Sequence, residues 1–123
     1  MAWALLRYQH SMETELRECA RAPLTGPVKF FEWNQAHPAH AQEISASGMF
    51  LRTTHCLAEG SMLTVRLALP GLARAFTVLA RVVRTVKGGR LAAPGMGVRF
   101  VDLRPAEKDL IAAYVARRVL EAA

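Results

Sequence analysis

Short segments that alternate apolar and polar side chains most restrict what this chain can fold into. Residues 64–69 alternate in this way, and residues 76–82 repeat the pattern after Pro70 and Gly71. Alternation with a period of two is typical of a strand with one buried face, and glycine and proline mark the turns between strands. The central part of the chain is therefore predicted to be β-structure.

Other segments extend this pattern toward both ends. Residues 34–42 hold two His, one Pro and three Ala and are predicted to form a loop, and Pro23, Gly26 and Pro27 are predicted to end any preceding helix. Lys87–Arg90 is predicted to be a hairpin turn. Further strand signals lie at residues 28–33, 44–53 and 96–101.

The chain closes with an amphipathic helix, predicted over residues 105–120. Pro105 suits a first helical turn and Asp102 is expected to help cap it. About five or six short strands and one helix favour a mainly β fold, a small antiparallel barrel with the helix over one mouth or face. On the predicted helix, one apolar stripe is formed by Leu110, Ile111, Tyr114, Val115 and Val119.

The predicted domain organisation is a helical or flexible segment at residues 1–16 and one barrel domain at residues 17–123.

Composition limits the partners of such a domain. The chain has 123 residues, 52% of them hydrophobic and 21% charged, which excludes a disordered chain. Its formal net charge of +6 favours an anionic partner: a nucleic acid, a phosphorylated small molecule or an acidic protein surface. The sequence contains neither a signal-peptide core nor an apolar run of about 20 residues, so we expect a cytoplasmic protein without a membrane span.

Signals for catalysis and for metal binding are weak. His37 and His40 have metal-ligand spacing, but no acid or thiol partner follows at ligand spacing, so no metal site is predicted. Ser45 and Ser47 lie in no nucleophile motif. We therefore expect no enzyme activity, no catalytic residues and no cofactor. The arginines are scattered along the sequence, and no nucleic-acid recognition motif accompanies them. We therefore predict no specific nucleic-acid partner, and a nucleic-acid-binding barrel remains the weakest alternative.

Two short motifs carry the functional signal. Arg17 and Arg21 place two guanidinium groups four residues apart, and guanidinium donors suit phosphate oxygens and purine edges. The turn that follows holds Glu43, Ser45 and Gly48. The carboxylate can accept hydrogen bonds from a guanine edge or hold an arginine, the hydroxyl can bond a phosphate or a base, and the glycine permits a close backbone approach or a positive φ.

Together and in this order, these residues resemble the PilZ domain family of receptors for the bacterial second messenger cyclic di-GMP. The family pattern is R-x-x-x-R followed by D/N-x-S-x-x-G at the start of a barrel strand. Arg17 and Arg21 match the first motif, while Glu43, Ser45 and Gly48 occupy the second, with Glu in the acidic position. The resemblance covers about residues 15–120. It implies cyclic di-GMP as the ligand of these five residues, with Arg84 as a weaker candidate beside a base.

The resemblance implies a non-enzymatic receptor that relays the ligand through loop ordering to an unidentified protein partner in motility, pilus or exopolysaccharide control. The alternative is a degenerate adaptor of the same fold that acts through protein contacts without the ligand. Three features favour this alternative. The Glu43 side chain is one methylene longer than the Asp or Asn of the family pattern, and Glu18 can pair with Arg17 or Arg21. The third feature is the apolar N-terminal segment, which contains Trp3, Leu5, Leu6 and Tyr8.

Overall fold

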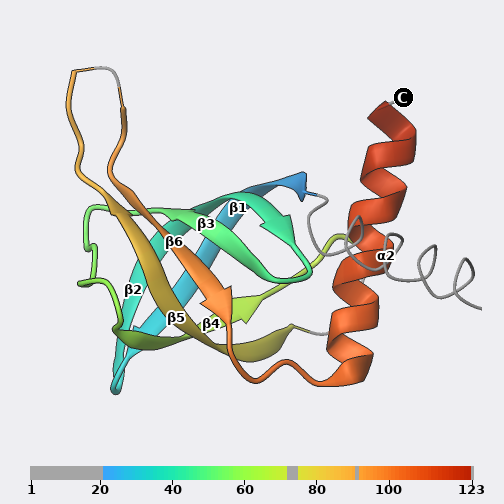
Figure 1. The fold of residues 1–123 in the computed structure, drawn as a ribbon, viewed down its shortest axis with the longest axis horizontal. Helices are drawn as coiled ribbons and strands as arrows, with labels where there is room; N and C mark the ends of the chain where they lie inside the picture. The colour runs from blue at the N-terminus through green and yellow to red at the C-terminus, as the bar shows by residue number, and fades with distance from the viewer. Residues whose placement is uncertain (1–20, 72–74, 91, 123) are drawn as a thin grey trace, which may run out of the picture.

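The computed structural model describes residues 21–71, 75–90 and 92–122. Within these residues the chain forms six strands followed by one helix (Figure 1). The helix is α2 (Pro105–Ala122). The strands are β1 (Arg21–Glu32), β2 (Gln35–Ser45), β3 (Gly48–Arg52), β4 (Met62–Leu67), β5 (Phe76–Val86) and β6 (Gly95–Phe100).

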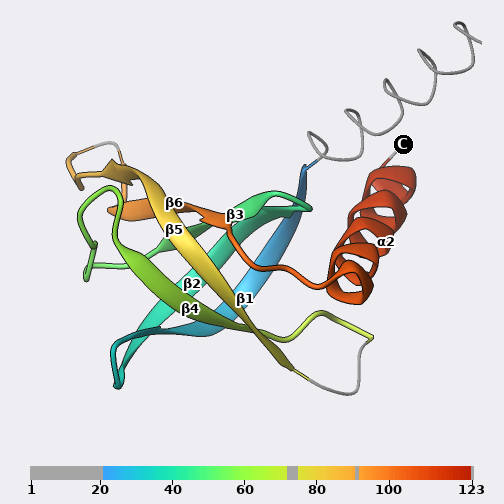
Figure 2. The ribbon, with the colours of Figure 1, turned by 60° about the horizontal axis from the view of Figure 1, so that its bottom comes forward.

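The six strands close into an antiparallel barrel in the order β1-β2-β3-β6-β5-β4, and the pairing of β1 with β4 completes it (Figure 2). Every second side chain of each strand points into the barrel, and these apolar side chains fill its interior. The most deeply buried large side chains include Phe30, Ile44, Leu51, Leu67 and Met96. This confirms the predicted fold class, a mainly β barrel with a C-terminal helix. The predicted segment 1–16 lies outside the described residues.

One local prediction was wrong. Residues 34–42, predicted to be a loop, belong mostly to β2, where Ala39 and Ala41 are buried while Pro38 and His40 are exposed. Alanine carries little hydrophobic signal, so the alternation is invisible until β1 and β3 pair with this segment on both sides. The Pro and Gly residues at 23–27 lie inside β1, where the β1–β2 register shifts at a bulge.

Helix α2 packs against β1 and β2 at the end of the barrel where β1 begins (Figures 1 and 2). Ile111 and Val115 are buried in the core, and the Tyr114 hydroxyl donates a hydrogen bond to the Pro23 carbonyl oxygen at 2.9 Å. The predicted stripe is narrower than expected, because Leu110 and Val119 are exposed.

Helix α2 begins at Pro105, as predicted, but its cap differs from the prediction. The Arg104 backbone N–H donates to the Glu107 carboxylate at 3.1 Å, half of a capping box, so Glu107 supplies the cap that was expected of Asp102. Within the described part of the chain, no helix is long and apolar enough to cross a bilayer.

Candidate functional site

A surface groove of about 420 Å³ lies beside the turn between β2 and β3. It brings together five of the six predicted ligand-binding residues, and the sixth, Arg17, lies outside the described residues. Those five, which come from four strands and the β2–β3 turn region, are Arg21, Glu43, Ser45, Gly48 and Arg84. Among the described residues, the groove therefore brings Arg21 of the first motif beside the second motif.

Strand register explains why these residues converge. Arg21 is the register partner of Ser45 across the β1–β2 pair, although the two residues are far apart in sequence. Arg84 is the register partner of Gly97 across β5–β6, just after an irregularity between Val82 and Arg84. A bulge changes the face to which the following side chains point. The long β1–β2 hairpin thus joins the two motifs, and the β5 bulge precedes the arginine that lies in the groove.

Arg21 and Glu43 form an ion pair in the groove. The Arg21 Nη1 donates to Glu43 Oε1 at 2.6 Å, with side chains 62% and 37% exposed. An exposed pair of this kind contributes at most about 1 kcal/mol to stability. Its main effect is positional, because it holds one guanidinium nitrogen at the groove wall while the other donors of that group stay available for a ligand.

Ser45 organises the β2–β3 turn. Its side chain is buried, and its hydroxyl oxygen accepts from the backbone N–H groups of Ser47 and Gly48, both at 3.3 Å. The same hydroxyl lies 3.0 Å from the Ser47 hydroxyl. A side chain that bonds the backbone two and three residues on is a local turn-forming device. The serine of the motif therefore shapes the groove wall in the structure as it stands.

The space around Gly48 explains its lack of a side chain. Gly48 has no positive φ, and a Cβ built on it would overlap the Val98 carbonyl oxygen of β6 and lie 3.2 Å from the Arg99 Cα. The close approach permitted here is that of one strand to another. Of the two roles that the sequence suggested for Gly48, a positive φ is therefore not found, and the contact between strands gives a reason for glycine that does not involve a ligand.

Arg84 and Phe50 also line the groove and pack against each other. The Arg84 guanidinium carbon lies 5.6 Å from the centre of the Phe50 ring, a cation–π arrangement. Planar groups of this kind can stack on a purine base. The two residues come from β5 and β3, so their contact exists only once β6 has paired with both strands.

Sequence reasoning missed Phe50 and Arg99, which also line the groove. The signal for Arg99 was present, because Met96 and Val98 are buried and alternation places Arg99 on the outer face of β6. Among the lining residues, three guanidinium groups stand against one carboxylate, and neither imidazole nor thiol is present. The groove is thus suited to bind an anion that carries planar rings.

Similar proteins were compared with the chain at the level of sequence and of structure. A model of the PilZ domain family matches residues 15–117. No curated protein matches the chain. Among solved structures, the Bacillus subtilis inhibitor of motility (MotI/DgrA) is similar with a TM-score of 0.71 and 17% identity, covering 83% of this chain and 50% of that one.

Two structures of Escherichia coli YcgR are also similar. YcgR in complex with c-di-GMP has a TM-score of 0.63 and 18% identity, covering 83% of this chain and 45% of that one. The PilZ domain of YcgR with c-di-GMP has a TM-score of 0.58 and 20% identity, covering 83% and 90%. The chain spans about half the length of MotI and of full YcgR. These likenesses show a shared fold, and because the family model spans most of the sequence, the chain belongs to the PilZ domain family.

Proposed function

We propose that this chain is a non-enzymatic receptor for cyclic di-GMP and that the ligand binds in the groove between Arg21 and Arg84. The observation that carries the proposal is the convergence of Arg21 and the second motif on one groove whose charged lining is mainly cationic. Family membership and the c-di-GMP complex of YcgR support it.

Each wall of the groove offers a different contact. Arg21, steadied by Glu43, would donate to phosphate oxygens or to the face of a guanine, and Glu43 would accept from a guanine N–H edge with its second oxygen. Arg84 above Phe50 would stack on a base. A few charge-assisted hydrogen bonds of about 1.5–3 kcal/mol each suffice for micromolar affinity after the cost of association.

The proposed relay begins at Arg17, which lies outside the described residues. A ligand held by Arg17 and Arg21 together would fix the connection into β1 and change what a protein partner meets at residues 1–16. The effector is proposed to be a protein of motility, pilus or exopolysaccharide control, and the site of action is proposed to be the cytoplasm.

Isothermal titration with cyclic di-GMP, with GTP as the comparison ligand, tests the proposal. Arg21→Ala should weaken binding by at least about tenfold, because one charge-assisted contact is lost. Arg66→Ala is the matched control: it removes the same charge from the exposed face of β4, outside the groove. Equal binding by Arg21→Ala and the parent protein would refute the site.

One observation favours the second candidate, an adaptor that acts through protein contacts without ligand. Glu43 already satisfies one donor of Arg21 at 2.6 Å, so the groove partly neutralises its own cation. If neither cyclic di-GMP nor GTP produces heat or raises the melting temperature of the folded parent protein, the adaptor is the correct assignment.

A further inference from the structure

Glu32, His37 and His55 form a second cluster of chemically active side chains, and it lies away from the groove. Glu32 ends β1, His37 stands near the start of β2, and His55 belongs to the loop between β3 and β4. The groove residue Arg21 is at the opposite end of the β1–β2 hairpin, whose tip carries this cluster (Figure 1). None of the three residues lines the groove.

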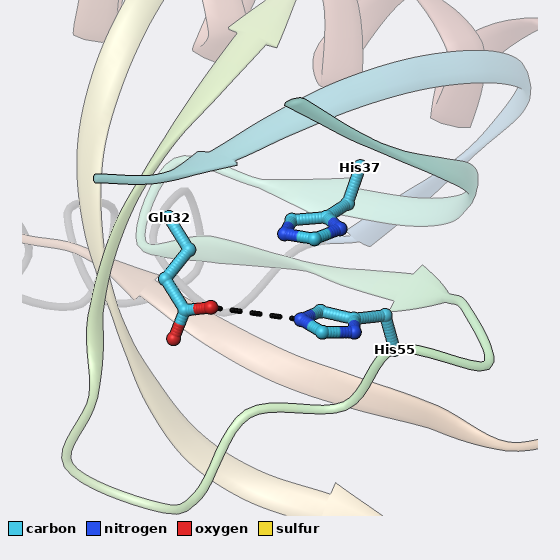
Figure 3. A group of neighbouring side chains, drawn as sticks. All are labelled: Glu32, His37 and His55. Carbon is cyan, nitrogen blue, oxygen red and sulfur yellow. Dashed lines mark ion pairs between the residues drawn. The ribbon is translucent and has the colours of Figure 1, made fainter. Parts of the chain in front are cut away.

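The three side chains bring their donor atoms close to one another. One ligand atom from each residue lies within 4.8 Å of those from the other two. The His55 Nε2 is 3.5 Å from Glu32 Oε1, and the two imidazole rings stack with centroids 3.8 Å apart and planes inclined by 11°. Figure 3 shows both rings with a nitrogen toward the side on which Glu32 lies.

The His37 ring gives an independent sign that the cluster is chemically incomplete. Its Nε2 atom is buried and has no hydrogen-bond partner among the residues that the structure describes. The ring also packs against Phe30, with centroids 5.2 Å apart, which fixes the imidazole in place. Buried polar atoms are nearly always paired, so an unpaired nitrogen beside a carboxylate and a second imidazole points to an absent partner.

We propose that Glu32, His37 and His55 bind a divalent transition-metal ion of the Zn²⁺ class. Two imidazole nitrogens and one carboxylate oxygen are a ligand set that suits Zn²⁺ and its neighbours, whereas Mg²⁺ and Ca²⁺ prefer oxygen alone. Three protein ligands leave a fourth position for water. The sequence analysis considered only His37 and His40 and predicted no metal site. These two residues lie three apart on a strand and therefore face opposite sides.

Metal binding requires a small rearrangement of the cluster. Ligands at about 2.0–2.1 Å around a tetrahedral ion are about 3.4 Å from one another, so the present group must contract by roughly 1 Å. The rings must also leave their parallel stacking, because the nitrogen lone pair lies in the ring plane. His55 can make this movement, since it lies in a loop and is exposed, while the half-buried His37 stays against Phe30.

A bound ion would tie the tip of the β1–β2 hairpin to the loop between β3 and β4. Because an unfolded chain does not hold these three ligands together, binding would stabilise the fold by mass action. The site is independent of the proposed cyclic di-GMP groove, so the failure of either proposal leaves the other standing.

Titration of the metal-free protein with ZnCl₂, followed by calorimetry and by the melting temperature, tests the proposal. The parent protein should bind one Zn²⁺ and melt at a higher temperature with it. His55→Ala and Glu32→Gln should each weaken binding by at least about 10–100-fold, since even indirect partners of metal ligands contribute this much. Both positions are at least one-third exposed, so the variants should fold.

The other two histidines of the chain supply the matched control. The double variant His10→Ala/His40→Ala removes as many imidazoles as the cluster contains but should bind Zn²⁺ as the parent does. Absence of Zn²⁺ binding by the parent, or equal affinity in His55→Ala and Glu32→Gln, would overturn the proposal. Loss of binding in the double control variant would overturn it as well.

Two optical measurements localise the ion. Co²⁺ in place of Zn²⁺ should give the visible absorption of tetrahedral nitrogen and oxygen coordination without a thiolate band, which excludes Cys56 as a ligand. Trp33 follows Glu32 directly, so in a Trp3→Phe background Cu²⁺ should quench its fluorescence in the parent but not in His55→Ala. Quenching that is equal in both proteins would contradict the assignment.

Discussion

Replacing Gly48 with alanine should destabilise the barrel far more than the same replacement at Gly97, although both glycines belong to the β3–β6 ladder. A Cβ on Gly48 would overlap the Val98 carbonyl oxygen, which belongs to backbone and cannot rotate away. At Gly97 the nearest atom to a new Cβ is the Arg84 Cβ at 3.7 Å, an ordinary contact.

The magnitude follows from what must move. Val98 is buried between β3 and β5, so relief of the overlap requires the end of β3 to separate from β6. Overpacking of this kind costs about 1–3 kcal/mol. The Phe100 N–H to Ser47 carbonyl hydrogen bond, 2.9 Å long, spans the same junction, and its loss adds about 1 kcal/mol. We expect Gly48→Ala to lose about 2–4 kcal/mol.

Urea unfolding, followed by circular dichroism, measures both variants against the parent protein. Gly48→Ala should also lower the melting temperature by roughly 10 °C, while Gly97→Ala should stay within about 0.5 kcal/mol of the parent. The reasoning is refuted if Gly48→Ala is as stable as the parent, or if Gly97→Ala loses as much as Gly48→Ala. In either case the glycine of the motif would need an explanation other than strand contact.

Three further predictions concern the hairpin tip, the helix and the ion pair. Trp33 is 94% exposed with a φ of 57°, so Trp33→Gly should raise the unfolding free energy by up to about 1 kcal/mol in a urea titration. Ile111→Ala should cost about 2–5 kcal/mol by the same assay, and the exposed neighbour Leu110→Ala much less. Glu43→Gln should change stability by less than about 1 kcal/mol yet weaken cyclic di-GMP binding in calorimetry, because Arg21 loses its ionic anchor. A loss of stability in Trp33→Gly would contradict the first prediction, and equal losses in Ile111→Ala and Leu110→Ala would contradict the second. Unchanged cyclic di-GMP binding by Glu43→Gln would contradict the third.

The sequence was most informative where a local repeat reports burial. Strands β4, β5 and β6 alternate clearly, and the stripe of α2 predicted the buried Ile111 and Val115. It was least informative in β2, where the inward positions hold His37, Ala39 and Ala41 while Pro38 and His40 are exposed. An alanine side chain buries little apolar surface, so the alternation in β2 is weak in the sequence. Pairing with β1 and β3 decides the structure of this segment instead.

The candidate groove shows the same division. Arg21, Glu43, Ser45 and Gly48 were predicted from two short sequence motifs and their resemblance to the family pattern. The sequence did not predict how these side chains lie relative to one another, because the 2.6 Å ion pair of Arg21 with Glu43 depends on the register of the long β1–β2 hairpin. The position of Arg84 in the groove depends on an irregularity in the pairing of β5, which no local sequence pattern predicts.

The sequence by itself therefore determined the barrel class, the closing helix and the two motifs, because periodicity and turn chemistry act over a few residues. Tertiary structure alone decided which side chains meet. Strand register joins residues that are distant in the chain, so Arg99 came to the groove and Glu32 and His55 came to His37. The sequence predicted no metal site. It offered only His40 at ligand spacing from His37, and the pleat of the strand turns His40 to the other side.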